Sequence, residues 1–178
     1  MKHIVLKSSL LVAIVAAVIF ISCSKNSSDG GTSTLHVRLT DGPTNLAEVN
    51  VDIREVKVKF SDDTSNVNGW VTMATNAGVY NLLGLQNGVD TLLATAPLPK
   101  DVVKEIRFVL GPNNSIKDTF GVVFPLTIPS GSESGLKIKV SKKLNADLET
   151  LIIDFDAALS IFRTGAGNYM LKPVLKIK

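Results

Sequence analysis

The sequence contains only one cysteine, Cys23, and only two histidines, His3 and His36. A single cysteine cannot form a disulfide within the chain, so no such bond can stabilise the fold. Because His36 is the only histidine beyond the N-terminal segment, zinc sites of the usual cysteine and histidine type are excluded. The chain also lacks a G-x-S-x-G turn, a P-loop and a G-x-G-x-x-G fingerprint. We therefore expect no catalytic residues and no enzyme activity.

Neither sign of charge dominates the composition. The chain has 19 basic and 16 acidic side chains, a net charge of +3, and Lys2 and Lys7 precede every acidic residue. Without these two lysines the balance is 17 basic against 16 acidic side chains, or +1. Proteins that bind nucleic acid usually carry a clustered basic excess, so we expect no nucleic-acid partner. Aromatic residues make up only 6% of the chain, which weakens the case for a large glycan-binding face.

The N-terminus carries the most specific signal in the sequence. Two lysines precede the apolar stretch 10–21, whose roughly 12 residues fit an export signal but fall short of the roughly 20 that a membrane-spanning helix needs. Ser22 directly before Cys23 resembles a bacterial lipoprotein signal, in which the cysteine is lipidated and becomes the mature N-terminus. The alternative is that Cys23 is a buried core residue and that residues 1–22 form an ordinary cleaved signal or an uncleaved span.

Composition then divides the chain into three parts. Residues 24–33 carry only small or polar side chains and should behave as a flexible coil. We expect a signal peptide at 1–22, a lipidated cysteine and tether at 23–33, and a single domain at 34–178. The acyl chains would hold the protein on the outer membrane, on its periplasmic or its surface-exposed side.

The body of the chain shows the period-two alternation of half-buried strands rather than a long helical stripe. Alternating apolar and polar residues occur at 35–39, 105–110, 136–140 and 151–155. Short helical turns are expected only at 44–48, 82–94 and 157–161. Many short strands without long helices favour an all-β fold, an antiparallel β-sandwich.

One strand changes the parity of its apolar positions. Val51 and Ile53 are odd-numbered, whereas Val56, Val58 and Phe60 are even-numbered. A β-bulge of one residue at Arg54-Glu55 would keep all five side chains on the core side. The alternative is a strand that passes from one sheet to the other at this point.

Asp154 and Asp156 flank Phe155, and strand alternation places the two carboxylates on one face, about 7 Å apart. In one interpretation they pair with basic side chains across the sheet. The candidate partners are Lys137, Lys139, Arg38 and Arg107. In another they join Asp41 and backbone carbonyls to bind calcium, although no EF-hand spacing is present. A third interpretation, a hydrolase using Asp154 and Asp156, would need a cleft between them.

Trp70 follows the polar segment 61–68 and begins a predicted strand. It is either a plug of the core or, if exposed, a platform for carbohydrate stacking. Together with Lys137 and the three aspartates it completes the set of candidate ligand-binding residues.

Several motifs point to a family. They are Leu39-Thr40-Asp41-Gly42-Pro43, Val51-Asp52-Ile53-Arg54-Glu55-Val56, Gly69-Trp70-Val71, Tyr80-Asn81-Leu82-Leu83, Ser134-Gly135-Leu136-Lys137, Asp154-Phe155-Asp156-Ala157 and Tyr169-Met170-Leu171-Lys172-Pro173-Val174. With them the chain resembles the domain-of-unknown-function 4382 family of Bacteroidetes lipoproteins, with one departure at Gly42, where the family more often has alanine. The resemblance implies an immunoglobulin- or transthyretin-like sandwich on the cell surface and no agreed activity.

These observations lead to one main hypothesis and one alternative. We expect an exported, membrane-anchored lipoprotein that acts as a non-catalytic binding or adhesion module, with loops 61–68 and 111–119 contacting a glycan or protein partner. The alternative is a structural subunit of a surface assembly that forms through its strand edges.

Overall fold

The computed structural model describes residues 31–60, 69–129 and 135–178. The described residues belong to one compact unit, Gly31–Lys178. Cys23, the predicted signal peptide, most of the predicted tether and the predicted contact loop 61–68 lie outside the described residues. Within the described ranges, the helices are all too short to cross a membrane.

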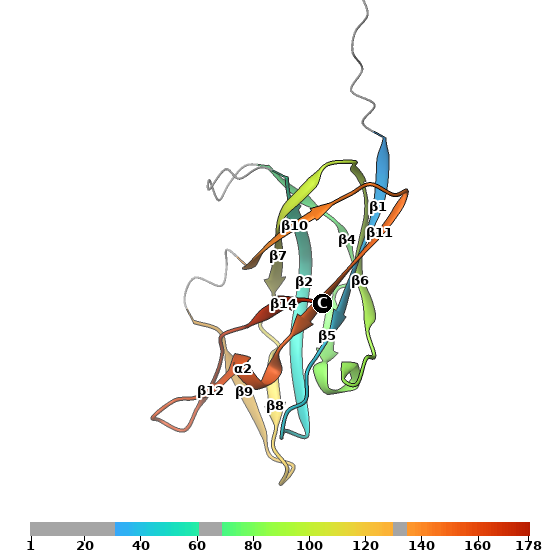
Figure 1. The fold of residues 1–178 in the computed structure, drawn as a ribbon. Helices are drawn as coiled ribbons and strands as arrows, with labels where there is room; N and C mark the ends of the chain where they lie inside the picture. The colour runs from blue at the N-terminus through green and yellow to red at the C-terminus, as the bar shows by residue number, and fades with distance from the viewer. Residues whose placement is uncertain (1–30, 61–68, 130–134) are drawn as a thin grey trace, which may run out of the picture. The chain divides into compact units, whose positions relative to one another are not determined.

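Two sheets make up the fold (Figure 1). The first has the order β14-β11-β1-β6-β4, formed by Leu175–Ile177, Leu148–Phe155, Thr32–Thr40, Thr91–Pro99 and Ala74–Thr75. The second has the order β10-β7-β2-β8-β9-β13-β12, formed by Leu136–Lys143, Val102–Leu110, Glu48–Lys59, Ser115–Lys117, Val123–Thr127, Tyr169–Leu171 and Ile161–Arg163. Strands β3 (Trp70–Thr72) and β5 (Gly78–Asn81) also pair with β2. The predicted all-β sandwich is confirmed.

The sheets are mixed rather than wholly antiparallel. Strand β1 pairs with β11 in parallel, and β13 pairs with β9 in parallel. A parallel pair needs a long connection between its strands, because a tight turn can only join antiparallel ones. Alternation within one strand reports which face is buried but carries no information on the direction of its neighbour.

The core lies between the sheets and includes the predicted alternating residues. On β1, Leu35, Val37 and Leu39 are fully buried, and Ile153 and Phe155 of β11 join the same apolar cluster. Each fully buried side chain of this size stabilises the fold by about 1.5–3 kcal/mol. The alternation read from the sequence therefore identifies the core-facing positions correctly.

The predicted bulge in β2 is also confirmed. The register of β2 against β7 shifts between Ile53 and Glu55. Val56 and Val58 beyond the shift are as fully buried as Ile53 before it, and Phe60 packs against the core. The strand stays in one sheet, so the alternative of a strand that changes sheets is wrong.

One boundary differs from the prediction. Strand β1 begins at Thr32, within the predicted tether, because Thr32 and Ser33 pair with Pro99 and Leu98 of β6. The side chain of Ser33 is buried. Small polar residues thus extend the strand, which their composition does not predict.

The expected helical turns are confirmed only in part. A 3-10 turn, η2, spans Leu82–Leu85, and a short helix, α2, spans Ala157–Ser160. The rest of the predicted turn at 82–94 is loop and strand, because β6 begins at Thr91. Residues 45–47 form a bend that leads into β2 at Glu48, so the helical turn predicted at 44–48 is wrong.

The sandwich has a proximal end, where β1 begins, and a distal end, where β2 begins. Strand β1 runs from Thr32 at the proximal end, where Lys100 N–H donates to Gly31 O, and spans about 30 Å. At the distal end β2 begins, and Glu48 pairs with Lys117 of β8. The β8–β9 turn, residues 118–122, projects from this distal end (Figure 1).

Candidate functional sites

Asp41 lies directly after β1, and its side chain is buried with 1% exposure. Its Oδ1 accepts a hydrogen bond from the Ala157 N–H at 3.0 Å, and its Oδ2 accepts one from Gln86 Nε2 at 3.3 Å. Burial raises the pKa of Asp41, the hydrogen bonds oppose that rise, and the charge of Asp154 adds to it. Asp41 therefore joins the end of β1 to α2 and to the segment after η2, which is a structural role.

Asp156 begins α2 and is held by two partners. Its Oδ1 accepts a hydrogen bond from the Leu159 N–H at 3.0 Å, and its Oδ2 lies 2.6 Å from Lys176 Nζ. The hydrogen bond from Lys176 lowers the pKa of Asp156, and the same bond raises the pKa of Lys176. This carboxylate is thus a helix cap and one half of an ion pair.

Asp154 lies opposite Lys176 of β14 and opposite Thr40 of β1. Its Oδ1 is buried and has no hydrogen-bond partner within the described ranges. Pairing across the sheet therefore places the two aspartates beside Lys176, not beside any of the expected partners. Of these, Arg38 pairs with Asp90, whereas Lys137, Lys139 and Arg107 belong to the other sheet.

The three aspartates lie near the same end of β11, yet they do not form an ion site. Among the described residues, no three His, Cys, Asp or Glu side chains are placed to hold a metal ion. Backbone N–H groups and Lys176 already bind oxygens of Asp41 and Asp156. The calcium and hydrolase interpretations gain no support from this arrangement.

Trp70 and Lys137 lie on the outward face of the second sheet. Trp70 pairs with Lys59 of β2, and Arg107 of β7 pairs with Lys57 on one side and Lys137 on the other. The indole ring reaches across this face, so that its centroid is 4.1 Å from Arg107 Cζ and 5.7 Å from Lys59 Nζ. Trp70 is therefore neither a plug of the core nor an open stacking platform.

Arg107 is the residue of this face that the sequence did not single out, except as a partner for the aspartates. Its side chain is only 8% exposed. Burial lowers the pKa of Arg107, and the charge of Glu105 opposes that effect. Gly135 makes the position possible, because a Cβ there would lie 2.7 Å from Arg107 Cγ. In the sequence, the alternation along residues 105–110 was the signal that placed Arg107 on the outward face.

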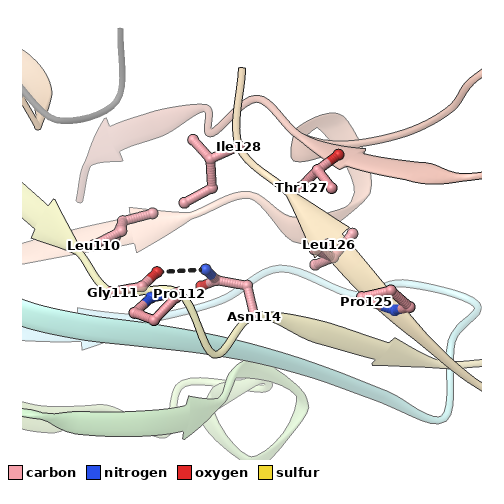
Figure 2. Close-up of a pocket in the computed structure, with 8 residues that line it drawn as sticks. All are labelled: Leu110, Gly111, Pro112, Asn114, Pro125, Leu126, Thr127 and Ile128. Atoms are coloured by element: carbon pink, nitrogen blue, oxygen red, sulfur yellow. Dashed lines mark hydrogen bonds between the residues drawn. The ribbon is translucent and has the colours of Figure 1, made fainter. Parts of the chain in front are cut away.

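A pocket of about 460 Å³ opens beside the end of β7 (Figure 2). It is lined by Leu110, Gly111, Pro112, Asn114, Pro125, Leu126, Thr127 and Ile128. Both polar atoms of the Asn114 amide are hydrogen-bonded, because its Nδ2 donates to Gly111 O at 2.7 Å and its Oδ1 accepts from the Asp52 N–H. None of the described residues around this pocket is ionisable, so they offer no acid or base.

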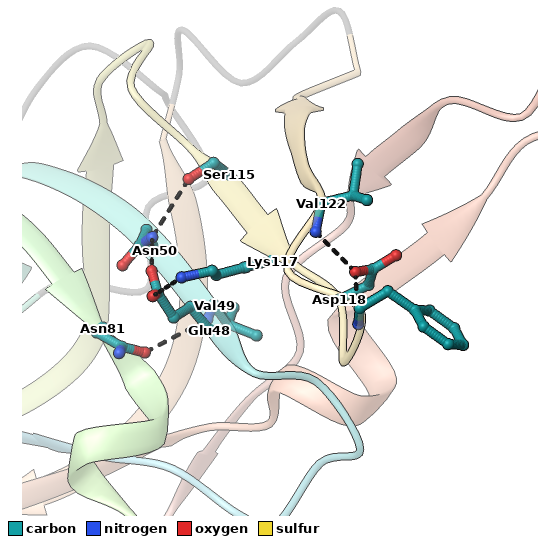
Figure 3. Close-up of polar contacts among 9 residues, drawn as sticks. Glu48, Val49, Asn50, Asn81, Ser115, Lys117, Asp118 and Val122 are labelled. Atoms are coloured by element: carbon teal, nitrogen blue, oxygen red, sulfur yellow. Dashed lines mark hydrogen bonds and ion pairs between the residues drawn. The ribbon is translucent and has the colours of Figure 1, made fainter.

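The β8–β9 turn at the distal end is a tightly held loop (Figure 3). Asp118 Oδ1 accepts hydrogen bonds from the N–H groups of Phe120 and Val122, both at 2.9 Å. Gly121 adopts a φ of +86°, which favours glycine. The Phe120 side chain at this turn is 90% exposed. The predicted contact loop 111–119 ends one residue before Phe120.

The base of this hairpin is fixed to the sheet (Figure 3). Lys117 Nζ lies 3.1 Å from Glu48 Oε1, and Asn50 Nδ2 donates to Ser115 Oγ at 3.3 Å. The ion pair lowers the pKa of Glu48. These contacts join β8 to β2, so the turn is presented from a strand that spans the sandwich.

The free edge of β10 carries features that oppose pairing with another chain. Among the described strands, β10 pairs only with β7. It contains four lysines, Lys137, Lys139, Lys142 and Lys143. Its register shifts between Lys139 and Lys142, around Ser141 with a φ of 124°. Lysines and irregular backbone both discourage edge-to-edge association, which does not favour an assembly through this strand.

Comparison with known proteins assigns the chain to a family. Neither curated proteins nor solved structures gave a match. A family model described as "Domain of unknown function (DUF4382)" matches residues 32–173, a range that extends from the start of β1 past the end of β13. The chain therefore belongs to the family Domain of unknown function (DUF4382).

Proposed function

We propose that this protein is an outer-membrane lipoprotein of the Bacteroidetes type, anchored through a lipidated Cys23, and that it acts as a non-catalytic binding module. Its contact surface is the β8–β9 turn, and its partner is a protein with an apolar cavity that accepts Phe120. The observation that carries this proposal is an aromatic side chain, 90% exposed, on a turn fixed by side-chain hydrogen bonds.

The energetics of the turn favour binding. Moving a phenylalanine side chain from water into an apolar cavity contributes about 1.5–3 kcal/mol. A mobile loop would lose part of this gain because binding would order it. Here Asp118 already holds the backbone of Phe120 and Val122, so little ordering is left to the binding step.

The position of the turn suits an anchored protein. The described chain begins at the proximal end with Gly31, and the turn lies at the opposite, distal end (Figure 1). A lipid on Cys23 followed by a short linker would hold the proximal end near the bilayer. Phe120 would then point away from the membrane, toward a partner.

The remaining groups support a non-catalytic role. Asp41 and Asp156 are held by structural hydrogen bonds, and the lining of the described pocket beside β7 has no ionisable side chain. A rigid β-scaffold with a projecting aromatic residue is sufficient for recognition and needs no reactive group.

The proposal is tested by site-specific photo-crosslinking in cells. A benzophenone amino acid at position 120 should give a covalent adduct with one protein, whereas the same amino acid at position 148 should not. Leu148 is a matched control because it is also an exposed apolar side chain, at 55%, but begins β11. Mass spectrometry of the mature N-terminus should show acyl chains on Cys23.

A binding measurement with the purified partner decides the role of the aromatic ring. Phe120→Ala should weaken the Kd about 30-fold, the equivalent of a 2 kcal/mol hot spot. Leu148→Ala should leave it unchanged. Equal adducts at both positions, or an unchanged Kd for Phe120→Ala, would show that the turn is not the contact surface.

A further inference from the structure

The outward face of β3, β2, β7 and β10 carries a second feature, independent of the β8–β9 turn. In the pairing register, Trp70 lies opposite Lys59, and Arg107 lies between Lys57 and Lys137. The side chains of Lys59 and Arg107 are 1% and 8% exposed, although both face away from the apolar core. A cationic cluster is thus held out of water beneath an indole ring.

Three hydrogen-bond donors of this cluster lack an acceptor. Arg107 Nε, Arg107 Nη2 and Trp70 Nε1 are all buried, and none has a hydrogen-bond partner in the part of the chain that the structure describes. A buried donor left unpaired costs about 1–3 kcal/mol, and native proteins rarely retain several together. The stacked pair of Arg107 and Trp70 is therefore short of acceptor atoms.

The identity of the unpaired atoms specifies the ligand. Nε and Nη2 lie on the same edge of the guanidinium group and donate in parallel, the geometry that accepts two oxygens of one carboxylate, sulfate or phosphate. An indole N–H is also a donor only. Glu105 already acts on the charge of Arg107, and a neutral sugar or an apolar group would add no further negative charge.

We propose that Arg107 and Trp70 form a binding site for an oxyanion, a carboxylate, sulfate or phosphate group carried by a ligand. Two oxygens of the anion accept hydrogen bonds from Nε and Nη2 of Arg107, and Trp70 covers the guanidinium plane. Lys59 supplies further positive charge beneath the same ring. Gly135 is required, because a larger residue would displace the stem of Arg107.

This site is separate from the proposed protein contact. Strand β2 begins at the distal end and runs to Lys59, so Trp70 and Arg107 lie nearer the proximal end than the β8–β9 turn does. Loss of either activity would leave the other intact.

Binding can be followed by the fluorescence emission of Trp70, because Trp70 is the only tryptophan of the chain. The full-length lipoprotein in detergent is titrated with sodium glucuronate, inorganic sulfate and inorganic phosphate at constant ionic strength, with glucose as the neutral counterpart of glucuronate. We expect a saturable change in Trp70 emission with at least one oxyanion and none with glucose. The three anions together tell whether the acceptor is the carboxylate of an acidic sugar or a free inorganic ion.

Two variants connect the response to the guanidinium fork. Arg107→Lys keeps the charge but loses the parallel donors, and should weaken binding at least tenfold. Lys143→Gln removes a charge of the same sign from the exposed end of β10 and should have no effect. Wild-type affinity in Arg107→Lys, or equal weakening in Lys143→Gln, would overturn the proposal.

Measurements on the wild-type protein decide the case even where Arg107→Lys fails to fold. A bound oxyanion should raise the Tm with increasing concentration, beyond the effect of sodium chloride at the same ionic strength. If no oxyanion gives a saturable change in emission or a specific rise in Tm, the site does not bind oxyanions and the three donors are satisfied by water or by the chain itself.

Discussion

The contact between Gly111 and Asp52 gives the sharpest test of the packing around β2. The Asp52 side chain is fully buried and forms an ion pair with Arg54, with Nε–Oδ1 and Nη2–Oδ2 distances of 2.8 Å each. Asp52 Oδ2 also accepts the Asn113 N–H at 3.1 Å. A Cβ added at Gly111 would lie 2.6 Å from Asp52 Cγ and 2.5 Å from Arg54 Nε, and closer still to Asp52 Oδ2. Gly111→Ala must therefore displace a fully buried carboxylate or the guanidinium that pairs with it.

The expected loss of stability in Gly111→Ala can be estimated from the hydrogen bonds that the displacement of Asp52 disrupts. Ordinary van der Waals contact begins at 3.4 Å, so the 2.6 Å approach to Asp52 Cγ requires a shift of at least 0.8 Å, and the closer Oδ2 requires more. A shift of that size disrupts the hydrogen bonds of Asp52 with Arg54 and Asn113. Hydrogen bonds to a charged group contribute about 1.5–3 kcal/mol each, and the half-exposed guanidinium of Arg54 reduces its share. We expect a loss of about 3 kcal/mol, which lowers the Tm of a domain of about 150 residues by roughly 6–12 °C.

Thermal unfolding followed by Trp70 emission measures this loss, and Gly42→Ala is the matched control. A Cβ at Gly42 meets no atom within 4 Å. There the substitution should stabilise the protein by about 0.4–1 kcal/mol, because alanine restricts the unfolded chain. In the double variant Asp52→Ala, Gly111→Ala, the two effects should be less than additive. A Tm of Gly111→Ala within about 1 °C of wild type, or strict additivity, would refute the steric explanation.

Two further predictions concern pH and register. The hydrogen bond from Lys142 lowers the pKa of Glu149 from 4.5 to about 2, so its contribution to stability is present above pH 4.5 and lost as the pH falls toward 2. Glu149→Gln should flatten the fall in Tm over that range, and an identical acid profile would contradict this assignment. Deletion of Glu55 removes the extra residue of the bulge and turns Val56 and Val58 toward solvent, at about 1.5–3 kcal/mol each. That deletion should abolish the cooperative unfolding transition, whereas Glu55→Ala, which keeps the register, should retain it.

The elements that the sequence predicted correctly are those encoded by local parity. Alternation along residues 35–39 or 151–155 depends only on which face of each strand is buried, and both segments have that face in the core. The bulge was predictable for the same reason, because the change from Ile53 to Val56 across two polar residues breaks the parity. Either a bulge or a change of sheet could cause this break, and the structure shows the bulge.

Features that depend on distant segments were not predictable. Lys176, the partner of Asp156, lies on the three-residue strand β14, which is too short to show alternation. The parallel pairing of β1 with β11 and the reach of Trp70 across β2 to Arg107 both depend on how the sheets assemble. The β8–β9 turn was within reach of the sequence, since Asp118 with Gly121 three residues later is a turn signature.

The bulge connects the fold to the proposed oxyanion site. Without the extra residue at Arg54-Glu55, the odd-numbered side chains that begin with Val51 and Ile53 would continue toward the core, and Lys57 and Lys59 would follow them there. The register shift turns both lysines outward, where Lys59 lies under Trp70 and Lys57 pairs with Arg107. One inserted residue therefore both completes the apolar core and places cationic side chains on the opposite face. Removing the bulge should abolish oxyanion binding together with the fold, whereas Arg107→Lys should weaken the binding alone.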